Sequence, residues 1–166
     1  MIQGFFELQM PEDLLRKLRH DHEQMRTCPF DPYMAYNFFI TAEAMVDWVY
    51  PGDKNKKKRI SLRKSEWFLQ AASDLAIAAK HFDLHAFHNT VDRVFVTAGW
   101  FPKNAFPKGS FPKGFMGDGA MMVCLLEGVE GEVKERFTAF AIATRVLEYW
   151  EKSIAIDELN HQDCSL

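Results

Sequence analysis

The chain has 166 residues, of which 48% are hydrophobic, 26% charged and 14% aromatic, and its formal net charge is −3. A chain of this length buries about 70% of its unfolded surface, so it needs neither disulfides nor a structural metal to fold. The longest strictly apolar run, residues 120–126, falls far short of the ~20 residues of a membrane-spanning helix and excludes integral membrane insertion. Three widely spaced cysteines and no recognisable secretory leader lead us to expect a cytoplasmic protein.

Apolar residues at helical spacing predict three helices in the first half of the chain. The first covers residues 11–26 and begins with a proline and two acidic residues, which are favoured at a helix N-terminus. The second covers residues 32–50, where Asp31 supplies an N-cap ahead of a proline. We expect a basic loop over residues 53–64 and a third helix at about 62–84.

The second half of the chain begins with β-branched and aromatic residues, which are typical of strands. Strands are predicted from Val91 and over residues 120–126, paired as an antiparallel hairpin. A final helix is expected at about 132–156, followed by a frayed tail over residues 157–166.

These elements predict a mainly α fold. We expect an antiparallel four-helix bundle with a β-hairpin and a long Phe-Pro-Lys loop inserted before the last helix. The bundle forms a single domain over residues 1–156, with the hairpin insertion at about 91–127. An isolated hairpin is marginal in water, so it has to cover either the bundle or a second subunit.

Basic charge is concentrated in residues 53–64. This segment carries +6, from seven basic residues and one acid, whereas the other 13 basic and 22 acidic residues give −9. A dipolar layout of this kind favours local contact with an anion over global attraction to nucleic acid, and it is equally typical of a solvated loop. The basic residues are Lys54, Lys56, Lys57, Lys58, Arg59, Arg63 and Lys64.

A Phe-Pro-Lys triplet occurs three times at intervals of five residues. Its phenylalanines are Phe101, Phe106 and Phe111, and its lysines are Lys103, Lys108 and Lys113. Aromatic rings interleaved with cations can stack bases and neutralise phosphates, which would make a surface for single-stranded nucleic acid. In the interpretation that we favour, the rings instead plug grooves of the bundle while proline stiffens a buried strap.

Four stretches of the chain occur in a familiar order: AYNFFITAEAMVDW, DLAIAAKHF, the Phe repeat and VLEYW. Together they resemble a group of small bacterial and phage proteins with no established activity, over about residues 30–152. The helical part is also similar to the HEPN superfamily, four-helix bundles that include RNA-cutting toxins. The resemblance implies a phage, defence or toxin-antitoxin context. This chain departs from the group by having Ser73 where an arginine typically precedes Asp74.

An RNA-cleaving site needs a base for the ribose 2′-hydroxyl and a cation for the charge that develops on phosphorus. His81 is the candidate base, and Lys80 or the cluster at 56–59 is the candidate cation. Asp47 or Asp74 would orient the imidazole. The alternative is an ordinary polar face and helix C-terminal cap, which we favour because cations complement the dipole at a helix end.

A metal site is a further alternative. His81, His85 and His88 share one helical face if the third helix extends that far, and Glu43 and Asp47 are similarly spaced. The Glu-x-x-His arrangement of di-iron bundles is absent from both helices, so we expect neither a metal nor a cofactor.

The leading hypothesis is an interaction protein without catalytic activity that forms a homo-oligomer or binds a protein partner. One alternative is a metal-independent, HEPN-like ribonuclease. The other is a single-stranded nucleic-acid-binding module that uses the basic segment and the three repeat lysines.

Overall fold

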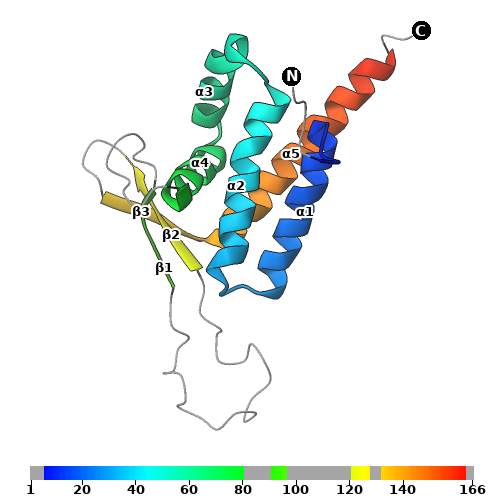
Figure 1. Ribbon diagram of the computed structural model, residues 1–166. Helices are drawn as coiled ribbons and strands as arrows, with labels where there is room; N and C mark the ends of the chain where they lie inside the picture. Colours follow the sequence, from blue (N-terminus) through cyan, green and yellow to red (C-terminus); the bar gives the residue numbers. More distant parts are fainter. Residues whose placement is uncertain (1–5, 81–90, 97–120, 128–131, 164–166) are drawn as a thin grey trace, which may run out of the picture.

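The computed structural model describes residues 6–80, 91–96, 121–127 and 132–163, with side chains at 6–80, 91 and 137–155. Its described part contains five α-helices and one three-stranded sheet, so the chain is mainly helical as expected (Figure 1). The Phe-Pro-Lys repeat and residues 81–90, which include His81, His85 and His88, lie outside the described residues.

The first two helices follow local signals in the sequence. Helix α1 spans Pro11–Thr27 and α2 spans Pro32–Val49, each within one residue of the prediction. The Asp31 carboxylate accepts a hydrogen bond from the Tyr33 amide at 2.9 Å and so caps α2. Because this cap depends only on neighbours in the chain, it follows from the sequence.

The expected basic loop over residues 53–64 was wrong, because most of this segment is helical. A short 3-10 helix, η1 (Asp53–Asn55), leads into α3 (Lys56–Ser65), and α4 (Trp67–Lys80) follows. Lysine, arginine and leucine are good helix formers, and no proline or glycine interrupts the run. Glu66 is extended, with φ −121° and ψ 101°, so the predicted single third helix is divided in two at this residue.

The sheet has the strand order β1-β2-β3 and is antiparallel throughout. Strand β1 spans Val91–Val96, β2 spans Met121–Glu127 and β3 spans Glu132–Thr138. Residues 132–138 were predicted to be helical, and this was wrong because they pair with β2 instead. Pairing with β2, which only four residues of chain separate from β3, overrides local helix propensity.

The last helix, α5, spans Ala139–Asp163. It begins where the Thr138 hydroxyl accepts a hydrogen bond from the Ala141 amide at 3.0 Å, an N-cap that the sequence analysis missed. The expected frayed tail was also wrong in part, because residues 157–163 continue this helix.

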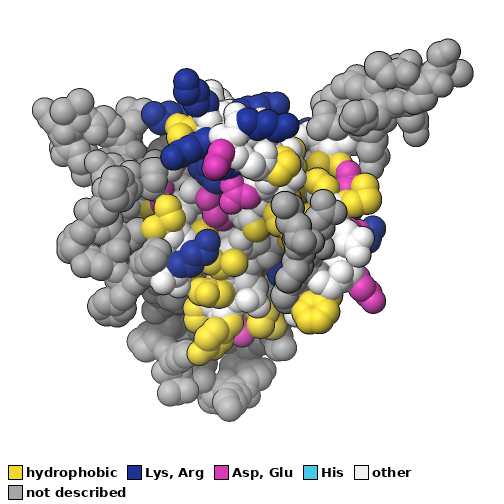
Figure 2. All heavy atoms as spheres, turned by 45° about the horizontal axis from the view of Figure 1, so that its top comes forward, with side chains coloured by type: hydrophobic (Ala, Val, Ile, Leu, Met, Phe, Trp, Pro, Cys, Tyr) yellow, Lys and Arg dark blue, Asp and Glu magenta, His cyan; other side chains and the backbone are white. Residues whose placement is uncertain are grey.

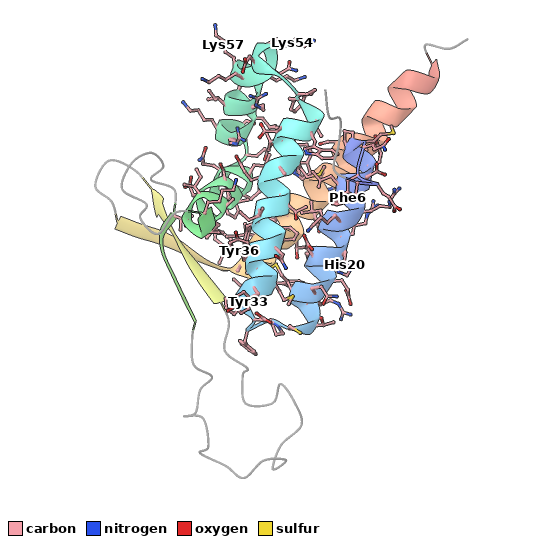
Figure 3. The ribbon with its side chains drawn as sticks, viewed as in Figure 1. Phe6, His20, Tyr33, Tyr36, Lys54 and Lys57 are labelled. Atoms are coloured by element: carbon pink, nitrogen blue, oxygen red, sulfur yellow. The ribbon has the colours of Figure 1, made fainter. Side chains whose placement is uncertain are left out.

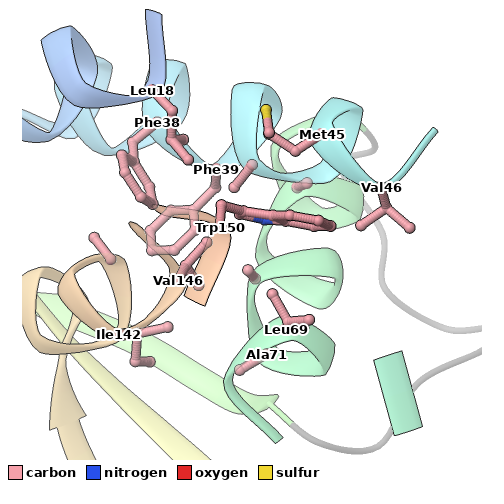
Figure 4. Close-up of a cluster of buried hydrophobic side chains, with 14 of the residues drawn as sticks. Leu18, Phe38, Phe39, Met45, Val46, Leu69, Ala71, Ile142, Val146 and Trp150 are labelled. Carbon is pink, nitrogen blue, oxygen red and sulfur yellow. The ribbon is translucent and has the colours of Figure 1, made fainter. Parts of the chain in front are cut away.

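The core lies between α1, α2, α4 and α5, which pack against one another. Trp150 of α5 is wholly buried in a cluster with Phe39, Val46 and Leu69 (Figure 4). Burying each such side chain contributes about 1.5–3 kcal/mol. Helix α3 places only the partly buried Leu62 against this core and contacts mainly α4 and η1. It is therefore an appended helix at one end of the molecule.

Among the described helices, none combines the length and the apolar character that crossing a membrane requires.

Candidate nucleic-acid interface

Five lysines of η1 and α3 are exposed, and we call them the outer lysines. Basic side chains gather at this end of the molecule, with acidic side chains below them (Figure 2). The labelled Lys54 of η1 and Lys57 of α3 lie at the end of this segment that is farthest from the core (Figure 3). The outer lysines are Lys54, Lys56, Lys57, Lys58 and Lys64.

Arg59 faces inward and anchors α3 to the end of α2. Its side chain is 16% exposed, and its Nε lies 3.0 Å from Asp47 Oδ1. Its Nη1 donates to the carbonyl oxygens of Tyr50 and Gly52, at 2.7 and 2.8 Å. The last carbonyls of a helix lack intrahelical partners, and a planar guanidinium can bond several acceptors at once. Arg59 therefore caps α2 while it fixes α3.

Arg63 makes the second anchor, with Glu43 of α2. Its Nη2 lies 2.6 Å from Glu43 Oε1 and its Nε lies 3.4 Å from Oε2, and both side chains are mostly buried. A forked contact of this kind adds geometric specificity to the charge attraction. The structure thus places Arg59 and Arg63, two of the predicted nucleic-acid contacts, against α2, and leaves the lysines on the outside.

Three positive charges lie close together in the N-terminal turn of α3. Lys56, Lys57 and Lys58 follow one another there without an acidic residue, and the N-cap Asn55 makes no side-chain cap. The positive end of the helix dipole disfavours cations by about 0.3–1 kcal/mol each. One of these charges is partly offset within the molecule, because Lys58 Nζ lies 4.1 Å from the centre of the Tyr50 ring. An external anion beside this turn would relieve the remaining repulsion.

The candidate catalytic residues that the structure describes lie in different surroundings. Asp47 is 60% exposed and paired with Arg59, whereas Asp74 is buried in α4 and accepts a hydrogen bond from Gln70 Nε2 at 2.9 Å. Lys80 is exposed at the described end of α4. No hydrogen bond or ion pair between any two of these three residues is found in the described part of the chain.

The metal alternative gains no support from the described residues. They contain no group of three or more histidine, cysteine, aspartate or glutamate side chains placed to hold a metal. Glu43 and Asp47, the carboxylates of that candidate site, are each paired with an arginine of α3.

The three repeat lysines, Lys103, Lys108 and Lys113, were the other predicted nucleic-acid contacts, and they lie outside the described residues.

A buried polar cluster between α1 and α2 was missed by the sequence analysis. Asp21 Oδ2 accepts from Lys17 Nζ at 2.5 Å and from the Thr41 hydroxyl at 2.7 Å. Lys17 Nζ also donates to Thr41 Oγ1 at 2.8 Å. The i, i+4 spacing of Lys17 and Asp21 was visible in the sequence, but nothing there indicated Thr41 as their partner. The hydrogen bonds to Thr41 join α1 to α2.

His22 makes a second polar contact inside the helical assembly. Its Nε2 lies 2.9 Å from Thr144 Oγ1, and its ring stacks on Phe140 with 4.6 Å between centroids. The Thr144 hydroxyl donates to the Phe140 carbonyl, so Nε2 of the neutral ring carries the hydrogen and donates to Thr144. Burial lowers the pKa of His22. This histidine therefore joins α1 to α5, and burial favours its neutral form.

Comparison with protein-family models, with curated proteins and with solved structures finds no match to this chain. The assignment of function therefore depends on the geometry of the outer lysines.

Proposed function

We propose that this is an interaction protein without catalytic activity, and that it binds nucleic acid through the outer lysines. One observation carries the proposal: the two arginines of α3 are used to dock the helix, whereas its lysines are presented to solvent. A rigid helix that holds several exposed cations is suited to the phosphate backbone. We also propose that α1, α2, α4 and α5 form an antiparallel bundle that carries this helix.

The charge balance limits how the protein approaches its partner. The residues outside 53–64 sum to −9, so they repel a polyanion while the basic segment attracts it. Contact is therefore confined to one end of the molecule. If all five outer lysines meet phosphates, the logarithm of the affinity for duplex DNA falls with the logarithm of salt concentration with a slope of about −4.5.

The test measures fluorescence anisotropy of labelled DNA and RNA across a series of salt concentrations. The variant Lys56→Gln/Lys58→Gln removes two outer lysines and should flatten the slope for duplex DNA by about 1.8. A matched control, Arg16→Gln/Lys152→Gln, removes two exposed positive charges from α1 and α5. It should leave the slope unchanged.

Binding that depends on neither salt nor the outer lysines would overturn the proposal. Equal loss of affinity in the two double variants would do the same, because it would point to net charge instead of α3. Tighter binding of polyglutamate than of nucleic acid would show that the surface takes an acidic protein.

HEPN-like RNA cleavage stays a prediction, because His81 lies outside the described residues. The same RNA incubations report on it directly. Cleavage that disappears in His81→Ala would replace the proposal of a non-catalytic protein.

A further inference from the structure

The outer lysines surround the exposed side of α3. Successive residues of a helix are about 100° apart, so Lys56 and Lys58 stand on opposite sides of Lys57. Lys64, seven residues further, returns to the side of Lys57 at about 10.5 Å along the axis. The exposed Ile60 and Ser61 lie between Lys57 and Lys64 on this side, which we call the ridge.

The docked side of α3 is opposite the ridge. Arg59, Leu62 and Arg63 fall at about 140–240° from Lys57, and all three are partly buried. The ion pairs of the two arginines with α2 hold this side in place. Consequently the ridge faces away from the bundle, and one lysine stands on each flank.

The aromatic rings beside α3 are already in contact with other side chains. Lys58 Nζ covers the Tyr50 ring, and the Trp67 ring packs against Phe68 and Phe137 with centroids 5.8 and 4.6 Å apart. The segment 53–65 itself contains no aromatic residue. The exposed Tyr33 and Tyr36 are near the opposite end of α2 (Figure 3). In the described part of this end, recognition by base stacking is therefore not supported.

An α-helix with its side chains is about 10–12 Å across, and the major groove of B-form DNA is about 12 Å wide. Two phosphate backbones border this groove, which suits cations on both flanks of a helix. A single strand offers only one backbone, and the major groove of A-form RNA is too narrow for a helix.

Given the proposed function, on which this inference rests, we infer that α3 binds duplex DNA with its ridge in the major groove. Lys56 and Lys58 then approach opposite phosphate backbones. Ile60, Ser61 and Lys64 lie over the base edges. Few side chains on the ridge can form hydrogen bonds with bases, so we expect weak sequence discrimination.

The first test compares a DNA duplex of about 20 base pairs with its single strand and with the matching RNA duplex. We expect the DNA duplex to bind at least about tenfold more tightly than either at 50 mM salt. With five phosphate contacts, the salt slopes for duplex and single-stranded DNA are about −4.5 and −3.5. The preference over the single strand should therefore fall about tenfold between 50 and 500 mM.

Chemical methylation identifies the groove, because guanine N7 faces the major groove and adenine N3 the minor groove. Bound protein should protect guanine N7 and leave adenine N3 reactive.

The variant Ile60→Glu places a carboxylate on the ridge at a side chain that is 44% exposed, so the fold should tolerate it. It should weaken duplex binding more than tenfold, while the control Met10→Glu, at a residue 58% exposed, should not.

Equal affinity for the single strand or the RNA duplex would overturn the inference and leave the proposed function in place. Protection of adenine N3 alone, or full binding by Ile60→Glu, would also overturn it. Absence of lysine-dependent binding to every nucleic acid would instead overturn the proposed function.

Discussion

Removal of the Arg59 side chain should release α3 without unfolding the core. Arg59→Ala deletes one ion pair and two hydrogen bonds to carbonyl oxygens. The ion pair with the exposed Asp47 contributes at most about 1 kcal/mol, and each carbonyl bond about 0.5–1.5 kcal/mol. The sum is about 1–4 kcal/mol. Because no residue of α3 is fully buried, this loss falls on the docking of α3 and not on the core.

Hydrogen exchange of backbone amides measures this local effect. A loss of about 1–4 kcal/mol corresponds to a roughly 5- to 700-fold faster exchange of amides in residues 56–65, because each 1.4 kcal/mol is about tenfold. Amides of α2 and α5 in the core should exchange at nearly the wild-type rate. Arg59→Lys should give an intermediate effect, because an ammonium group lacks the planar fork of donors.

The control for this experiment is Lys57→Ala, at the opposite side of the same helix. Lys57 is exposed, and its removal relieves crowding at the helix N-terminus. It should leave exchange in α3 unchanged or slower. If Arg59→Ala and Lys57→Ala accelerated amide exchange in α3 equally, Arg59 would not be an anchor. The same conclusion would follow if Arg59→Ala lowered the thermal midpoint strongly without changing amide exchange in α3.

Three further predictions concern the core and its connections. Trp150→Ala should lower the free energy of unfolding by about 3–5 kcal/mol in chemical denaturation. Trp150→Phe should cost less, because the indole N–H has no hydrogen-bond partner in the described structure; an equal loss would contradict this view. Burial lowers the pKa of His22, so the unfolded chain binds more protons as the pH falls below about 6.5. The thermal midpoint should therefore fall between pH 7 and pH 5, and His22→Gln should flatten this dependence; an unchanged profile in the variant would assign it to other groups. Gly52 has φ +77° and ψ 166°, a conformation that is essentially restricted to glycine. Gly52→Ala should cost about 1–3 kcal/mol in thermal denaturation even though the new Cβ meets no atom within 4 Å, and an unchanged midpoint would show that the turn relaxes without strain.

The two kinds of error in the sequence analysis have different physical origins. The helix at residues 56–65 was missed because its lysines indicated a solvated loop, although their helix propensity was high. The strand at 132–138 was missed because Val133 and Phe137 continue the helical spacing of α5, although only four residues separate β3 from its pairing partner β2.

The amino-acid sequence alone determined the mainly helical class, the starts of α1 and α2, and the concentration of basic charge in one segment. These properties follow from interactions between residues close together in the chain. Only the tertiary structure decided that Arg59 and Arg63 turn inward while the lysines stay outside. The arginines turn inward because they form ion pairs with Asp47 and Glu43, two carboxylates of α2 that lie against the docked side of α3.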